Sequence, residues 1–115
     1  MRIEVRSRNA EVTDELRQAV VKRFSRIGRQ VSGLATLEVE LREERNPAIT
    51  HRYVAEANLY LKGATLHAEE ASPDMLHSIH ELAEDVRRQV KRHREKRRKR
   101  ADARRVAGRL RRRAA

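Results

Sequence analysis

The stretch AEANLYLKGATLHAEE, residues 55–70, decides the fold. Apolar side chains occupy every second position from Ala55 to Leu61. A period of two is typical of a strand with one buried face. The pair Lys62-Gly63 then predicts a tight turn, and the alternation resumes until about Glu70. The stretch therefore predicts two consecutive strands of a meander, each with one side towards a core.

Two further strands are predicted upstream. Residues 2–8 place Ile3 and Val5 on one side, between charged neighbours. Residues 37–42 repeat the pattern, with alternating aliphatic and charged side chains. An Asn46-Pro47 turn separates this strand from the one that begins near residue 55.

Two helices complete the pattern. The first is predicted from an N-cap at Thr13 to a stop at Gly28. The second starts at Ser72-Pro73-Asp74, with the serine as N-cap and the proline at the first helical position. The apolar positions at helical spacing are Leu16, Val20, Phe24 and Ile27 in the first helix, and Leu76, Ile79, Ala83, Val86 and Val90 in the second. Beyond Val90 the apolar stripe ends but helix-forming residues continue, so the helix can project as a basic rod.

The predicted order β-α-β-β-β-α indicates an α+β fold of two layers. A four-stranded sheet carries both helices on one face, similar to double-stranded-RNA-binding folds. The first helix crosses over between two parallel strands. We expect a folded domain over residues 1–100 and a basic, flexible tail over 101–115, where Gly108 can interrupt the helix and no secondary structure is assigned.

Charge divides the chain unevenly. The 28 basic and 17 acidic residues give a net charge of +11. Residues 1–85 hold 12 basic and 15 acidic side chains, whereas residues 86–115 hold 16 and 2. A basic end on a near-neutral body predicts a polyanion partner, with nucleic acid first because arginine outnumbers lysine. An anionic membrane is disfavoured, since no basic helix has a broad face of large apolar residues.

Several classes of function are excluded or disfavoured. The chain contains no cysteine, which removes disulfides, thiolate catalysis and cysteine-ligated zinc. Residues 1–6 alternate in charge, so we expect neither a signal peptide nor a membrane span, and a cytoplasmic protein. His77 and His80 are spaced i, i+3, but without an HExxH pattern a metal site there is a remote alternative. We expect no enzyme, catalytic residue, metal, cofactor or small-molecule substrate.

Basic side chains follow the flank of each helix. On the first helix Lys22 and Arg26 share a flank, and Arg23 lies near its edge. On the second helix one stripe and its margin contain Arg87, Arg88, Lys91, Arg92 and Arg94. Together they predict a positive surface that binds phosphates. For the first helix alone, an ordinary solvated flank is an equally good interpretation. Because stacking aromatics are scarce, structured RNA fits better than single strands.

Four segments resemble the ribosome hibernation-promoting factor family, also called ribosome-associated translation inhibitors and ribosomal subunit interface proteins. They are RNAEVTDELR (8–17), KRFSRI (22–27), KGATLHAEE (62–70), and DM (74–75) with Ile79 and RQVKRHR (88–94). They span about residues 3–94 in the family's order. Leu76, where the family often has tyrosine, and His80, in place of an acid, depart from the pattern.

The resemblance implies a ribosome-binding domain over residues 1–100 whose partner is the small ribosomal subunit and its RNA. Family members occupy the channel for mRNA and tRNA, stop translation by occlusion and preserve idle ribosomes under stress. By position, the implied RNA contacts are Arg23, Arg26, Arg88, Arg92 and Arg94. Lys22, Arg87 and Lys91 are added from the helical faces alone. The chain is either a short member or the N-terminal domain of a long one.

Two other nucleic-acid binders remain as alternatives. A double-stranded-RNA-binding domain usually has a lysine cluster where its last helix starts, but here that start is SPDM, residues 72–75. A general structured-RNA or nucleoid-binding protein is the second alternative, because it would need the same basic surface.

Overall fold

The computed structural model describes residues 1–114 and contains four strands and two helices. In chain order these are β1 (Arg2–Arg8), α1 (Asp14–Gly28), β2 (Thr36–Glu43), β3 (Tyr53–Leu61), β4 (Ala64–Ser72) and α2 (Met75–Ala114). The order and type of all six elements confirm the predicted β-α-β-β-β-α arrangement.

The four strands form one sheet in the order β1-β2-β3-β4. β1 and β2 are parallel, as expected for strands joined by a crossover helix, and the other neighbours are antiparallel. The register aligns Val5, Val39, Ala57 and Ala68 in one row across the sheet. The β3–β4 turn contains Gly63 at a φ of +77°, a conformation that glycine adopts without steric strain.

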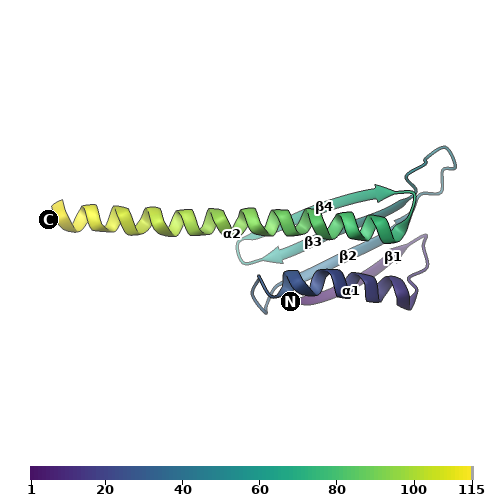
Figure 1. The fold of residues 1–115 in the computed structure, drawn as a ribbon, viewed down its shortest axis with the longest axis horizontal. Coiled ribbons are helices and arrows are strands. Elements are labelled where there is room, and N and C mark those ends of the chain that lie inside the picture. Colours follow the sequence, from purple (N-terminus) through teal and green to yellow (C-terminus); the bar gives the residue numbers. More distant parts are fainter. Residues whose placement is uncertain (115) are drawn as a thin grey trace.

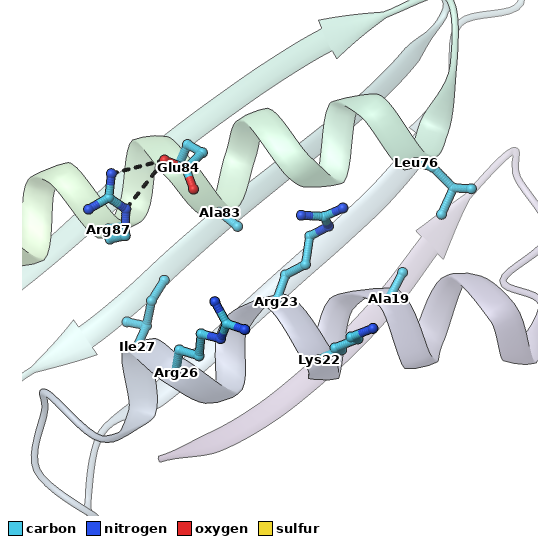
Figure 2. A pocket seen from close by; sticks show the side chains of 9 residues that line it. All are labelled: Ala19, Lys22, Arg23, Arg26, Ile27, Leu76, Ala83, Glu84 and Arg87. Carbon is cyan, nitrogen blue, oxygen red and sulfur yellow. Dashed lines mark hydrogen bonds and ion pairs between the residues drawn. The ribbon is translucent and has the colours of Figure 1, made fainter.

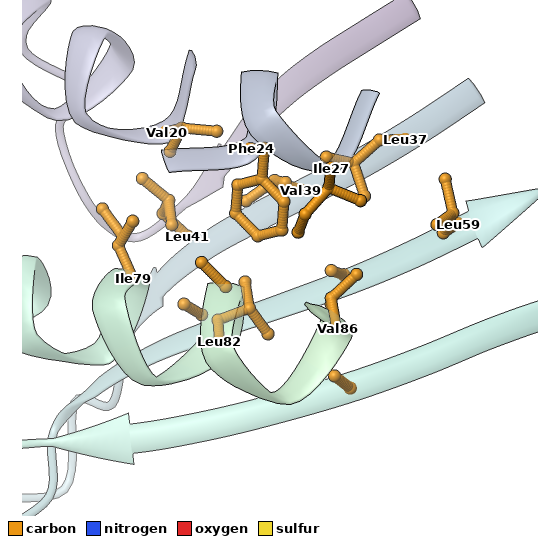
Figure 3. Packing of buried hydrophobic residues seen from close by; sticks show 14 of the residues in the cluster. Val20, Phe24, Ile27, Leu37, Val39, Leu41, Leu59, Ile79, Leu82 and Val86 are labelled. Atoms are coloured by element: carbon orange, nitrogen blue, oxygen red, sulfur yellow. The ribbon is translucent and has the colours of Figure 1, made fainter. Parts of the chain in front are cut away.

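Both helices cover the same face of the sheet, so the fold has two layers (Figure 1). The main fully buried helical side chains are Val20 and Phe24 of α1 and Ile79, Leu82, Val86 and Val90 of α2. They pack against the inner faces of the strands (Figure 3). Burial of each large aliphatic or aromatic side chain stabilises the domain by about 1.5–3 kcal/mol.

The predicted start of α2 is corrected by the structure. Ser72 is the last residue of β4, and Asp74 caps the helix by accepting a hydrogen bond from the His77 backbone N–H at 3.2 Å. The Ser72 hydroxyl is buried and lies 2.6 Å from the Ser78 hydroxyl, which donates to the Tyr53 carbonyl at 2.6 Å. Ser72 therefore stabilises the junction between β4 and α2 and does not cap the helix.

The length of α2 also differs from the expectation. Its helix runs through Gly108 to Ala114, where the sequence assigns no secondary structure, and only Ala115 lies outside the described residues. Arginine, lysine and alanine are strong helix formers, and one glycine costs only about 1 kcal/mol relative to alanine. The division into a domain and a separate tail at residue 100 stays a prediction.

Candidate nucleic-acid interface

The buried stripe of α1 determines where its cations lie. Thr13 caps the helix, with its hydroxyl oxygen 3.2 Å from the Leu16 backbone nitrogen. Val20, Phe24 and Ile27 then face the core. Because successive residues are rotated by about 100° in an α-helix, the neighbouring Lys22, Arg23 and Arg26 project from the helix surface outside the core.

The buried stripe of α2 has the same effect. Ile79, Leu82 and Val86 face the sheet and turn one flank of the helix towards α1. That flank carries His80, Glu84 and Arg87. Charged side chains from two separate elements are thereby brought to one place.

A groove lies between the two helices, with a volume of about 690 Å³ (Figure 2). Small side chains, Ala19 from α1 and Ala83 from α2, leave this space open, and half-exposed Leu76 lines it towards the start of α2. Its cationic lining consists of Lys22, Arg23, Arg26 and Arg87, and its acidic lining of Glu84. The groove is therefore predominantly positive.

Two contacts order the side chains of the groove. Arg23 extends from α1 and its Nη1 atom lies 2.6 Å from Nδ1 of His80 on α2. A guanidinium can only donate, so this contact requires an unprotonated Nδ1 on His80. Arg87 donates to Glu84 at 3.0 and 3.3 Å, and this hydrogen bond lowers the pKa of the Glu84 carboxyl. The single acid of the groove is thus already paired.

In the part of the chain that the structure describes, the other predicted cations have no carboxylate oxygen within 4.0 Å. Among residues 1–112, Arg87 is the one predicted RNA-binding residue with a nitrogen within 4.0 Å of a carboxylate oxygen. The remaining predicted cations are Lys22, Arg23, Arg26, Arg88, Lys91, Arg92 and Arg94. Unpaired arginines and lysines are suited to phosphate oxygens, which form short, charge-assisted hydrogen bonds with them.

The eight predicted residues do not share one surface. Lys91 and Arg94 follow Arg87 by one and two turns on the same side of α2, but they lie beyond the groove and do not line it. Arg88 and Arg92 are rotated further round α2, away from that flank.

Arg88 has an acidic environment on its own side of α2. Burial and a hydrogen bond with Asp85 raise the pKa of the Glu70 carboxyl on β4, and nearby Arg88 opposes this rise. The structure thus brings four of the predicted cations together round the groove and places Arg88 close to acids.

The open face of the sheet contrasts with the helical face. Its four arginines all lie near carboxylates, with nitrogen–oxygen distances of 3.4 Å for Arg2–Glu4, 4.0 Å for Arg6–Glu38, 3.7 Å for Arg8–Glu40 and 2.6 Å for Arg42–Glu69. Exposed pairs of this kind contribute little stability. They do neutralise the sheet, so the uncompensated positive charge of the domain lies on its helices.

Two features of the groove were missed by sequence reasoning. The sequence indicates His80 as a remote metal partner of His77 and as a departure from the family pattern, whereas in the structure it contacts Arg23. The ring centroids of His77 and His80 lie 6.5 Å apart. The space beside Ala19 and Ala83 was not anticipated either. The signal available in the sequence is one small residue on each helix, Ala19 and Ala83, beside the apolar positions.

The sequence is similar to known proteins over most of its length. The family described as Sigma 54 modulation protein / S30EA ribosomal protein matches residues 3–98. The ribosome hibernation promoting factor of Salmonella typhimurium is 28% identical over 96 residues, which cover 84% of this chain and 96% of that protein. The ribosome hibernation promotion factor of a Picosynechococcus species is 26% identical over 97 residues, covering 84% and 50% of the two chains.

Solved structures agree with the fold. The Protein Y N-terminal domain of Thermus thermophilus aligns with a TM-score of 0.68 and 29% identity, over 81% of this chain and 99% of that one. A ribosomal subunit interface protein of Coxiella burnetii aligns with a TM-score of 0.71 over 83% and 99%. Its 18% identity supports the fold alone.

The fold and the family match together identify a ribosome-associated α+β domain. The chain belongs to the family described as Sigma 54 modulation protein / S30EA ribosomal protein, whose matched relatives are ribosome hibernation promoting factors. The predicted resemblance is confirmed. Membership establishes a ribosome-binding factor of translation regulation and hibernation, and it implies a cytoplasmic location. The matched relatives are named as ribosome factors and not as enzymes.

Within residues 1–114, neither helix has an apolar stretch long enough to span a bilayer.

Proposed function

We propose that this protein binds the small ribosomal subunit through ribosomal RNA and occupies the channel for mRNA and tRNA. Translation then stops by occlusion, and idle ribosomes are preserved under stress. The observation that carries the proposal is the groove between α1 and α2, where Lys22, Arg23 and Arg26 have no acidic partner within the described residues. Cations on two packed helices lose less conformational entropy on binding phosphates than cations on a flexible segment, because their backbone is already fixed.

The type of RNA follows from the composition of the surface. Tyr60 lies on the open face of the sheet, where its hydroxyl donates to Glu38 at 3.2 Å. The groove is on the opposite side of the sheet, between the helices. No Tyr, Phe or Trp side chain lines the groove. Stacking of unpaired bases is therefore disfavoured, and contacts to the phosphate backbone of folded RNA are favoured.

Sedimentation tests the partner. When a cell lysate is centrifuged through a sucrose gradient at low magnesium, we expect the protein to migrate with the small subunit and with intact ribosomes. Moderate salt and excess ribosomes suppress weak nonspecific attachment, because phosphate contacts weaken steeply with salt. Protein that stays at the top of this gradient, or spreads equally over all RNA, would contradict the proposal. The second result would instead support a general RNA-binding protein.

Stoichiometry tests the mechanism. In a purified translation system, inhibition by occlusion should rise linearly with added protein and reach its maximum at about one protein per ribosome. A catalyst would act at far smaller amounts, because each molecule would inactivate many ribosomes. Peptide synthesis is measured against a titration of protein at fixed ribosome concentration. Strong inhibition at a hundredth of the ribosome concentration would exclude occlusion.

A further inference from the structure

α2 continues well past the sheet on which it packs. Gln89 donates from Nε2 to the His67 carbonyl on β4 at 2.7 Å, and Val90 is the last buried residue of the helix. Figure 1 shows the helix extending beyond the β3–β4 turn. At 1.5 Å per residue, residues 91–112 extend for about 33 Å. Within this segment all described side chains are exposed apart from half-buried His93.

This segment, residues 91–112, is here called the basic extension. It contains 13 basic and 2 acidic residues. Arg105 lies 3.9 Å from Asp102, and within the described residues the other 12 cations have no carboxylate oxygen within 4.0 Å. Like charges spaced i, i+4, such as Arg94 with Arg98 and Arg100 with Arg104, repel one another. A bound polyanion would relieve this repulsion.

One face of the basic extension continues the buried stripe. Val86 and Val90 face the sheet, and at the same helical angle beyond the sheet come Arg97 and Arg104. Together with Arg100 they line a shallow hollow of about 240 Å³. The side of α2 that is apolar above the sheet is therefore arginine-rich where the sheet ends.

We propose that the basic extension is a second RNA-binding site, separate from the groove, that binds double-helical RNA through its phosphate backbone. Arginine, the commoner cation here, has a planar guanidinium that can bind two phosphate oxygens at once. Residues 91–115 contain no Tyr, Phe or Trp, so they offer no platform for unpaired bases. RNA is the polyanion that a ribosome-binding family encounters, and this inference does not depend on which channel the groove occupies.

Charge density and surface chemistry favour a duplex over other anions. A duplex carries about one phosphate charge per 1.7 Å of axis, so a length of duplex equal to the basic extension holds roughly 20 phosphates. The 13 cations of the basic extension are a comparable density of opposite charge, and those on one side of the helix can contact the phosphates nearest to them. An anionic membrane is a poor match, because Val106 and Leu110 are the only exposed large apolar side chains described in the segment.

Binding of the full chain to a 20-base-pair RNA duplex unrelated to ribosomal RNA tests the proposal. Fluorescence anisotropy is measured over a range of salt concentrations. The variant carries Arg97→Gln, Arg100→Gln and Arg104→Gln, which preserve helix propensity. The control carries Arg2→Gln, Arg8→Gln and Arg17→Gln, with the same change in net charge in the folded body. We expect the first variant to lose about tenfold or more in affinity and about three units of salt slope, and the control to lose neither.

Three results would overturn the proposal. Equal losses in the two variants would mean that total charge alone governs binding. If single-stranded RNA of the same length binds as tightly as the duplex, the basic extension is not specific for double-helical RNA. If the protein binds vesicles containing phosphatidylglycerol, and the three arginine substitutions weaken this binding as much as duplex binding, the segment is a membrane site. An Arg23→Glu, Arg26→Glu variant that loses ribosome binding but keeps duplex affinity would separate this site from the proposed function and support both.

Discussion

Replacing both Arg23 and Arg26 by glutamate is expected to lower affinity for the small ribosomal subunit at least about 100-fold. Both side chains line the groove, and neither has a carboxylate partner among the described residues. Each charge-assisted hydrogen bond to a phosphate contributes about 1.5–3 kcal/mol, and a reversed charge adds repulsion. Affinity is measured by sedimentation or filter binding at one fixed salt and magnesium concentration.

The matched control is Arg2→Glu with Arg17→Glu, which changes net charge equally. Arg2 lies on the open sheet face and Arg17 is exposed on α1 before the groove. Neither side chain lines the groove, so only screened long-range repulsion should act, and the loss of affinity in this control should be limited to about threefold. Thermal unfolding of both variants shows that the fold is retained. Equal losses of affinity would mean that the groove is not the binding site.

The same measurement on Arg88→Glu with Arg92→Glu decides how far the site extends round α2. Both positions match the family motif, yet they lie off the groove flank, and Arg88 is close to Glu70. A loss as large as that of the Arg23 and Arg26 variant would show that RNA wraps both sides of α2. A small loss would confine the site to the flank that faces α1.

The fold could be predicted because local patterns and global packing agree. Alternation from Ala55 to Leu61 gives a strand whichever neighbour it pairs with, and the Lys62-Gly63 turn fixes the hairpin that follows. Helical spacing likewise identified the side chains of α1 and α2 that reach the core. In this chain the period of the apolar residues was sufficient to identify both layers.

The groove could not be predicted to the same depth. A periodic pattern shows which flank of a helix is charged. Which flank of each helix faces the other depends on how α1 and α2 cross, and 46 residues separate these helices in the chain. That crossing brings Arg23 to His80 and turns Arg88 towards Glu70. Both relations are tertiary, so neither leaves a mark in the local sequence.

The start of α2 shows a second limit. Ser72, Pro73 and Asp74 each favour a helix start, and the pattern cannot rank them. The structure selects Asp74 because the Ser72 backbone is still part of β4, where it is paired with Tyr53. The buried contact between the Ser72 and Ser78 hydroxyls then joins the end of the sheet to the first turns of α2.

Phe24→Ala is expected to remove most of the stability of the domain, with a loss of about 3–5 kcal/mol. The ring is fully buried between α1, the sheet and α2, so its removal leaves a cavity that neighbouring side chains fill only in part (Figure 3). Domains of this size have about 5–15 kcal/mol in total. Thermal unfolding followed by circular dichroism should therefore show a melting temperature lower by more than about 10 °C.

Leu34→Ala is the matched control, because Leu34 is also a large apolar residue but is 94% exposed. Its replacement should change the free energy of unfolding by no more than about 0.5 kcal/mol. Because Phe24 packs α1, which carries Arg23 and Arg26, into the core, ribosome binding by Phe24→Ala should fall with the folded fraction and recover at lower temperature. A melting temperature within about 3 °C of the parent would show that α1 does not pack as described, and the groove built on it would then be wrong.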